Sequence, residues 1–218
     1  FTWRESKEEL TDYVTELTKD HMRDYYRANF WPNTPDILPH HLQGAPPSAF
    51  KIRAALAATL SSSWGIYSGY ELCENRPLPG REEYLDSEKY HSKPRKCQSA
   101  GYITAWLARI NKVWKENEAL QSYANIEFIP CDNEQMIAFW KWSEDKENRI
   151  IVVINLDPFH RHETTIHLPL EELGIPENEE FVVEDVIYEE VYTWRESTNF
   201  VALDPRAKPV HVLRVRNS

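Results

Sequence analysis

Residues 49–72, AFKIRAALAATLSSSWGIYSGYEL, decide how the first half of this 218-residue chain is built. The stretch 49–60 is apolar on nearly every side, a pattern typical of a helix that is buried all round. Ser48 stands directly before it and is a favourable N-cap residue. The stretch 64–72 follows after three serines, and its composition predicts a buried strand and the exit from it. The sequence therefore predicts a helix followed by a strand.

Strand and helix signals continue on both sides of this pair. Residues 1–3 are strand-like, and Ser6 with Glu9 forms a capping-box pattern, which predicts the start of a helix. Apolar residues then recur along one helix face as far as Leu17. Residues 29–31 predict a short strand that ends before a proline, and residues 103–118 predict another amphipathic helix. Residues 1–122 therefore alternate between strand and helix.

Three such units need a larger sheet, because parallel strands are stable only when both faces are covered. The chain also starts without methionine, so we expect it to be part of a longer polypeptide. The simplest complete arrangement is a (β/α)8 TIM barrel of which this chain holds the last three units. Sites in such barrels lie at the carboxyl ends of the strands. Asp36, held between two prolines, follows one predicted strand, and Glu71 and Glu74 follow the next.

The second half has a different sequence pattern, with short alternating or β-branched runs separated by turn residues. This pattern predicts an antiparallel β-sandwich. We therefore expect two domains, a barrel part at 1–122 and a C-terminal β-sandwich at 123–218. The predicted strands are NIEFIP, QMIAFWKW, RIIVVINL, ETTIHLP, FVVEDV, VYTW and PVHVLRVR.

Charge and cysteine content limit the partners of the protein. The formal net charge is -10 and the sequence pI is about 5.3, so a nucleic acid backbone would be repelled. No apolar run approaches the roughly 20 residues of a membrane span. Cys73, Cys97 and Cys131 are far apart and form no C-x-x-C pair, which favours reduced thiols in a cytoplasmic protein. We expect no nucleic acid partner and no membrane association.

The segment NTPDI, residues 33–37, resembles the fourth conserved motif of the α-amylase superfamily, which presents a catalytic carboxylate after the seventh barrel strand. Longer segments are similar to the maltosyltransferases that use α-maltose 1-phosphate to extend α-1,4-glucans. These segments are FTWRESKEELTDYVTELT (1–18), AFKIRAALAATLSSSWGIYSGYELCE (49–74), EEYLDSEKY (82–90) and VEDVIYEEVYTWRESTNFVALDP (183–205).

The resemblance implies roles for matching residues. Asp36 aligns with the carboxylate that stabilises an oxocarbenium-like transition state by holding hydroxyls of the transferred sugar. Lys89 and Tyr90 align with residues that bind the phosphate end of the donor, and a cation and a phenol suit that group. Asn33 and Pro35 match the motif and can serve its geometry alone. No cofactor is implied.

The reaction implied is retaining transfer of maltosyl units from α-maltose 1-phosphate to the non-reducing end of an α-1,4-glucan, with release of phosphate. Retention requires a nucleophile and an acid/base roughly 5 Å apart. In this family the nucleophilic Asp and the acid/base Glu follow the fourth and fifth strands, upstream of Phe1. We therefore expect the fragment alone to be inactive, and the resemblance implies a homodimer for the full-length protein.

Two other functions remain open. An α-amylase-type hydrolase or another transglycosylase would share Asp36 but would have no use for Lys89 and Tyr90. A non-catalytic glucan-binding module would rely on the sandwich instead. In that part of the chain, the aromatic residues that could bind glucan or pack against the barrel are Trp140, Trp142, Trp194 and Phe159.

Several other residues favour structural interpretations. Trp64, Tyr67 and Tyr70 lie on a predicted buried strand, so core packing is favoured over a sugar platform. His40 and His41 are adjacent but lack further ligands at metal-binding spacing, so we expect no metal. The carboxylates of Glu71 and Glu74 are given no catalytic role and are only candidates to support the site.

Overall fold

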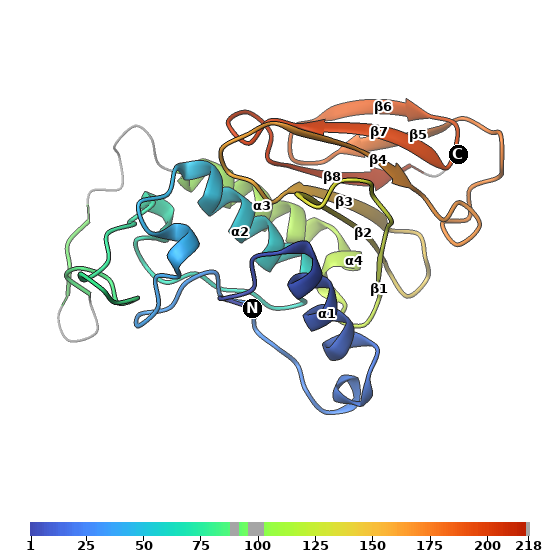
Figure 1. Ribbon diagram of the computed structural model, residues 1–218. Coiled ribbons are helices and arrows are strands. Elements are labelled where there is room, and N and C mark those ends of the chain that lie inside the picture. The colour runs from blue at the N-terminus through green and yellow to red at the C-terminus, as the bar shows by residue number, and fades with distance from the viewer. Residues whose placement is uncertain (88–91, 96–102, 217–218) are drawn as a thin grey trace.

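The computed structural model describes residues 1–87, 92–95 and 103–216. Helices occupy the first half of the chain and strands the second (Figure 1). The α-helices are α1 (Lys7–Thr18), α2 (Pro47–Leu60), α3 (Thr104–Glu116) and α4 (Glu118–Gln121), with 3-10 helices at His21–Asp24, His40–Leu42 and Tyr70–Leu72. None of the described helices is both long and apolar enough to cross a membrane.

The starts of α1 and α2 test the capping predictions. At α1 the capping box is confirmed, because Ser6 Oγ accepts a bond from the Glu9 amide and the Glu9 carboxylate accepts one from the Ser6 amide, each 3.1 Å long. At α2 the prediction for Ser48 is wrong. The helix begins at Pro47, two residues before the predicted start at Ala49, and the fixed φ and missing N–H of proline suit the first helical position. Ser48 Oγ instead donates to the carbonyl of Pro158 at 2.7 Å.

The second half is antiparallel, as predicted. Its six-stranded sheet has the order β1-β2-β3-β8-β5-β6, and β4 pairs with β7 in a separate two-stranded sheet. Strand β7 was not predicted. The strands are β1 (Ile126–Phe128), β2 (Met136–Trp142), β3 (Arg149–Asn155), β4 (His162–His167), β5 (Phe181–Asp185), β6 (Glu190–Trp194), β7 (Thr198–Leu203) and β8 (Val210–Val215).

Two extended segments of the first half lie side by side, and the strand expected over residues 1–3 is wrong, because these residues form a turn in which the Arg4 N–H donates to the Phe1 carbonyl at 2.9 Å. Phe30 and Trp64 form a parallel bridge, with Phe30 N–H donating to Ser63 at 2.9 Å. The ring of Phe1 stacks on Phe30 with centroids 4.5 Å apart, and Thr2 Oγ1 donates to the carbonyl of Trp31 at 2.7 Å. The strand predicted over 64–72 is confirmed only at its first residue.

A turn at Gly69 and a 3-10 helix occupy the end of the stretch that was expected to be a strand. Gly69 has a φ of +96°, a conformation that L side chains rarely adopt, and a Cβ there would lie 2.4 Å from Glu74 Oε2. The chain turns at Gly69 into the 3-10 helix Tyr70–Leu72. Tyr70 is fully buried and its hydroxyl donates to the Phe50 carbonyl at 2.5 Å, which agrees with the core role favoured for it.

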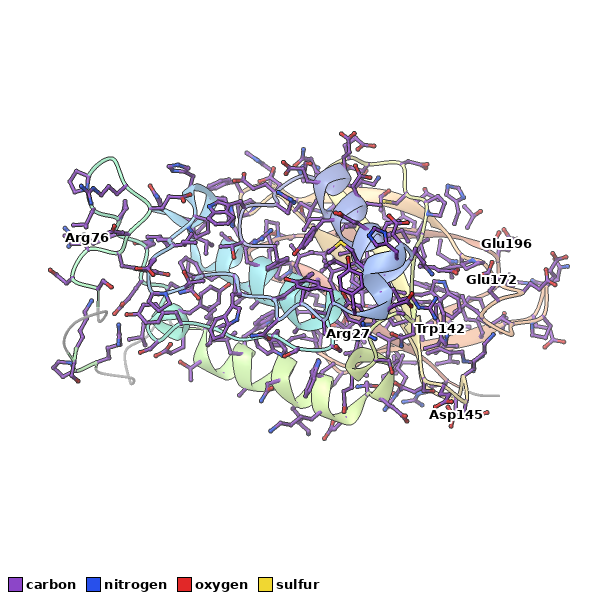
Figure 2. All side chains as sticks on the ribbon, turned by 90° about the horizontal axis from the view of Figure 1, so that it is seen from below. Arg27, Arg76, Trp142, Asp145, Glu172 and Glu196 are labelled. Carbon is purple, nitrogen blue, oxygen red and sulfur yellow. The ribbon has the colours of Figure 1, made fainter. Side chains whose placement is uncertain are left out.

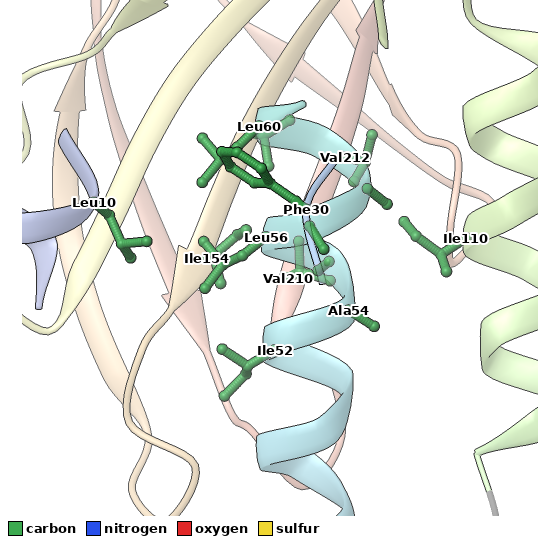
Figure 3. Packing of buried hydrophobic residues seen from close by; sticks show 14 of the residues in the cluster. Leu10, Phe30, Ile52, Ala54, Leu56, Leu60, Ile110, Ile154, Val210 and Val212 are labelled. Atoms are coloured by element: carbon green, nitrogen blue, oxygen red, sulfur yellow. The ribbon is translucent and has the colours of Figure 1, made fainter. Parts of the chain in front are cut away.

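The large sheet separates two apolar cores. Side chains alternate between its faces, so Ile150, Val152 and Ile154 of β3 point to the helices, while Ile151 and Val153 belong to the core shared with β4 and β7. Figure 3 shows Ile154, Val210 and Val212 near α2 in the helix-facing core. Helices α2 and α3 therefore cover one face of the sheet and the β4–β7 pair covers the other (Figure 1).

Candidate active site around Asp36

Asp36 lies in a tight turn. The Thr34 N–H donates to the Ile37 carbonyl at 3.0 Å, and the Ile37 N–H donates back to Thr34 at 3.2 Å. Pro35 occupies the second position of this turn, where its fixed φ is favourable, and Asp36 occupies the third. The side chain of Asp36 is exposed. The sequence therefore places a carboxylate on a turn that its own proline makes rigid.

Asn33 anchors the base of this turn. It is fully buried, its amide nitrogen donates to the Tyr84 hydroxyl at 2.6 Å, and its amide oxygen accepts from the Tyr67 N–H at 3.0 Å. Tyr84 is also buried, which raises the pKa of its phenol, so it remains a neutral partner. One side chain thus joins three segments that are far apart in sequence. This geometry gives Asn33 the positioning role that its place in the motif suggested.

The segment 82–87 runs along the other side of the turn. The Leu38 N–H donates to the Glu82 carbonyl at 2.5 Å, and Ser87 Oγ donates to the Pro35 carbonyl at 3.3 Å. This segment leads directly to Lys89 and Tyr90, which lie outside the described residues. Sequence reasoning missed Tyr84, although its place inside the similar segment 82–90 was an available signal.

Glu71 and Glu74 have structural partners. Glu74 binds Arg95 through two hydrogen bonds of 2.9 and 3.2 Å and lies 3.5 Å from Lys93, while Glu71 accepts from the Gly69 N–H at 2.9 Å. Beside Glu74 and Tyr84 lies a small cavity of about 170 Å³, which Arg76 also lines. Figure 2 shows Arg76 at the end of the molecule opposite Glu172 and Glu196.

The two adjacent histidines have separate acidic neighbours. His41 Nδ1 lies 3.1 Å from a carboxylate oxygen of Glu5, and His40 Nε2 lies 3.9 Å from Glu82. Burial, followed by the charge of Arg53, lowers the pKa of His41 to about 4, so its ring is neutral at pH 7. Over residues 1–87, 92–95 and 103–216, no group of three His, Cys, Asp or Glu side chains could hold a metal ion.

Comparison with known proteins shows which proteins this chain is similar to. Residues 128–215 match the family described as GLGE, C-terminal. Over 220 residues the chain is 47% identical to α-1,4-glucan:maltose-1-phosphate maltosyltransferase 1 of Streptomyces coelicolor, covering 99% of this chain and 32% of that protein. It is 44% identical over 215 residues to the Rhodospirillum rubrum maltosyltransferase of the same name, covering 99% of this chain and 31% of that protein.

A solved structure shares the fold at low sequence identity. The noncanonic maltogenic α-amylase AmyB from Thermotoga neapolitana aligns over 97% of this chain and 46% of its own, with a TM-score of 0.66 and 15% identity. The sequence resemblance to maltosyltransferases is confirmed by the relatives. The chain is similar to the α-1,4-glucan:maltose-1-phosphate maltosyltransferases and spans about a third of their length, and its residues 128–215 match the family described as GLGE, C-terminal.

Proposed function

We propose that this chain is part of a retaining maltosyltransferase that transfers maltosyl units from α-maltose 1-phosphate to the non-reducing end of α-1,4-glucans and releases phosphate. The observation that carries the proposal is identity of 44–47% over 99% of the chain to proteins of that name. The full-length protein acts in the cytoplasm as a homodimer.

In this proposal Asp36 stabilises the transition state. Its carboxylate accepts hydrogen bonds from hydroxyls of the sugar being transferred, and these bonds strengthen as positive charge develops on the ring. A carboxylate can do this only if it stays in place while the sugar distorts. The turn at Pro35 is closed by two backbone hydrogen bonds, and the side-chain amide of Asn33 is buried beside it. Both features support that role, because they fix the backbone that carries Asp36.

The donor phosphate is bound by Lys89 and Tyr90. The contacts of segment 82–87 with Leu38 and Pro35 support this assignment, since they hold the chain that precedes Lys89 against the Asp36 turn. A lysine supplies a positive charge and a tyrosine supplies a hydroxyl donor for the phosphate oxygens.

The remaining catalytic groups are contributed by the rest of the parent protein. The segments at Phe1, Phe30 and Trp64 belong to the last three βα units of a (β/α)8 barrel, in which they precede the helices α1, α2 and α3. The nucleophilic Asp and the acid/base Glu lie on earlier barrel units. The fragment alone is therefore inactive.

The test is phosphate release from α-maltose 1-phosphate by the full-length parent protein, with a malto-oligosaccharide as acceptor. We expect Asp36→Asn to lower the rate by about 10³-fold or more, because the amide keeps the shape of the side chain but loses its charge. Asp24→Asn, the same change at an exposed 3-10 helix residue, is the control and keeps the parent rate. A parent that cleaves starch and releases no phosphate would show an amylase-type hydrolase instead.

A further inference from the structure

A cavity of about 480 Å³ lies where the helical half meets the sandwich. Its walls come from the start of α1, from α2, and from the loops that precede β2 and follow β3. Ile52 and Leu56 of α2 give it an apolar wall, and Phe159 also lines it. We call it the junction cavity. Its volume is in the range of ligand sites, roughly 300–1,000 Å³.

Phe159 differs from the other aromatic residues considered for glucan binding. Trp140 is buried and contacts the tilted ring of Trp142 with centroids 4.3 Å apart, and Trp194 meets the ring of Phe181 edge-on. These three tryptophans pack in the sandwich core. The side chain of Phe159, in contrast, is 57% exposed. Of these four residues, only Phe159 is exposed.

Polar contacts hold the loop of Phe159 in one conformation. Asp157 accepts hydrogen bonds from the backbone N–H of Phe159 at 2.8 Å and from the rings of His160 and His162 at 2.9 and 3.0 Å. The Asn155 amide donates to the His160 carbonyl at 2.9 Å. An exposed aromatic ring on a rigid loop is typical of a binding residue, because little conformational entropy is lost when a ligand arrives.

The charges around the cavity disfavour an anionic ligand. Lys7 Nζ already donates to the carbonyls of Cys131 and Asn133 at 3.0 and 3.3 Å. The guanidinium of Arg53 donates to the carbonyls of Arg4 and Phe1 at 2.6 and 3.0 Å. Against these two engaged cations stand the carboxylates of Glu5, Glu8 and Glu134.

The N-terminus of α1 is equally engaged, because its capping box uses Ser6 and Glu9. An aromatic face surrounded by carboxylate and amide acceptors suits a neutral ligand with many hydroxyl groups. Gln135 and Glu8 both line the cavity with exposed side chains that can take part in such contacts.

We propose that the junction cavity binds the α-1,4-glucan, with a glucose ring stacked on Phe159 and its hydroxyls bonded to Gln135 and Glu8. This inference rests on the proposed function for the choice of glucan among neutral polyhydroxylated ligands. The site would hold a long acceptor to the enzyme at a place built from both halves of the chain.

The test is the mobility of the full-length parent protein in native gels that contain glycogen, with phosphate release from a short malto-oligosaccharide acceptor measured in parallel. We expect Phe159→Ala to weaken glycogen binding roughly tenfold and to leave phosphate release with the short acceptor unchanged. Phe159→Trp keeps a ring face and should bind as the parent does. Phe200→Ala is the matched control, because Phe200 is 64% exposed on β7 and does not line the cavity.

The two proposals can fail separately. Equal retardation of the parent and the Phe159→Ala variant by glycogen would overturn the junction site, whatever the phosphate assay shows. A selective loss of retardation in Phe159→Ala, in a parent that releases no phosphate, would support the site while the proposed reaction fails. Equal losses in Phe159→Ala and Phe200→Ala would also overturn it, since the effect would then not depend on the cavity.

Discussion

The two halves of the chain differ in how the backbone N–H and C=O groups of their extended segments are paired. In the second half, β2 pairs with β3 along seven residues and β5 pairs with β6 along five, each in an antiparallel hairpin. In the described part of the first half, the parallel contact between extended segments is the single bridge of Phe30 with Trp64. The sheet is therefore built from hairpins of neighbouring strands, which β8 joins by pairing with β3 and β5, whereas the extended segments of the first half meet in a parallel contact that a hairpin cannot make.

The helices of the first half nevertheless pack into an apolar core that they share with the sheet. Leu56 of α2, Ile110 of α3 and Leu120 of α4 belong to the same buried cluster as Phe139 of β2 and Val212 of β8. One core thus crosses from the helices to the sheet. The difference teaches that the first half has little backbone pairing of its own and shares its side-chain core with the sheet.

The largest effect on stability is expected at this shared core. Phe139 is fully buried on the helix-facing side of β2, so Phe139→Ala should lower the free energy of unfolding by about 3–5 kcal/mol. Denaturant unfolding measures the loss, and hydrogen exchange shows where it occurs. If the halves unfold as one unit, amides of α2 and β8 should lose protection together.

Phe200→Ala serves as the control for that measurement, because its exposed ring should contribute within about 0.5 kcal/mol. Loss of protection in α2 alone, with β8 unchanged, would contradict unfolding of the two halves as one unit. The helical half would then be a separate unit that rests on the sheet.

The sequence predicted most of the second half because its strands follow a local rule. Alternating and β-branched runs such as 149–155 predict strands when turn residues flank them. Strand β7 was missed because Asn199 and Ala202 are poor strand formers and Phe200 faces outward, so its pairing with β4 decides its conformation. The strand expected over 64–72 is wrong beyond Trp64, because its pairing with Phe30 is a single bridge and the chain turns at Gly69.

The Asp36 site was predictable in part. The order Asn-Thr-Pro-Asp indicates a turn that presents a carboxylate, and the structure has that turn. The contact of Asn33 with Tyr84 joins residues 51 positions apart, and no local pattern specifies it. Sequence thus locates the functional group, while the groups that hold it in place become visible only in three dimensions.

Lys141 offers a way to sharpen the comparison between the halves. It is fully buried on the helix-facing side of β2, and its ammonium donates to the Ser122 carbonyl at 3.0 Å. Burial lowers its pKa to about 7 from an ordinary value of 10.5. Between pH 7 and 10.5 the unfolded chain therefore binds more protons than the folded one, so this group makes stability rise with pH across that window.

Lys141→Met should remove the cost of burying a charge. We expect a gain of about 1–4 kcal/mol at pH 6, which shrinks as the pH approaches 10. Thermal unfolding at a series of pH values measures it. Lys115→Met, at an exposed position of α3, is the control and should change stability by less than about 0.5 kcal/mol. A loss of stability at pH 6 would mean that the bond to Ser122 outweighs desolvation.

The smallest expected effect on stability lies in the loops of the first half, at Asn33. Asn33→Ala leaves the Tyr67 N–H and the Tyr84 hydroxyl without their buried partner, which should cost about 1–3 kcal/mol. The loss should appear as faster hydrogen exchange at the Tyr67 amide and as slower phosphate release by the parent protein. Asn29→Ala is the matched control, because it removes only an exposed bond from Ser63.

These two readouts separate the contributions of the turn and of its anchor. If exchange at Tyr67 rises while phosphate release stays at the parent rate, the turn with Pro35 holds Asp36 without help from the buried amide. If both change in Asn33→Ala and neither changes in Asn29→Ala, the position of Asp36 depends on a side chain bonded to two other loops. The first half would then depend on buried side-chain hydrogen bonds to position its candidate site. The sheet, in contrast, is held by a continuous ladder of backbone hydrogen bonds.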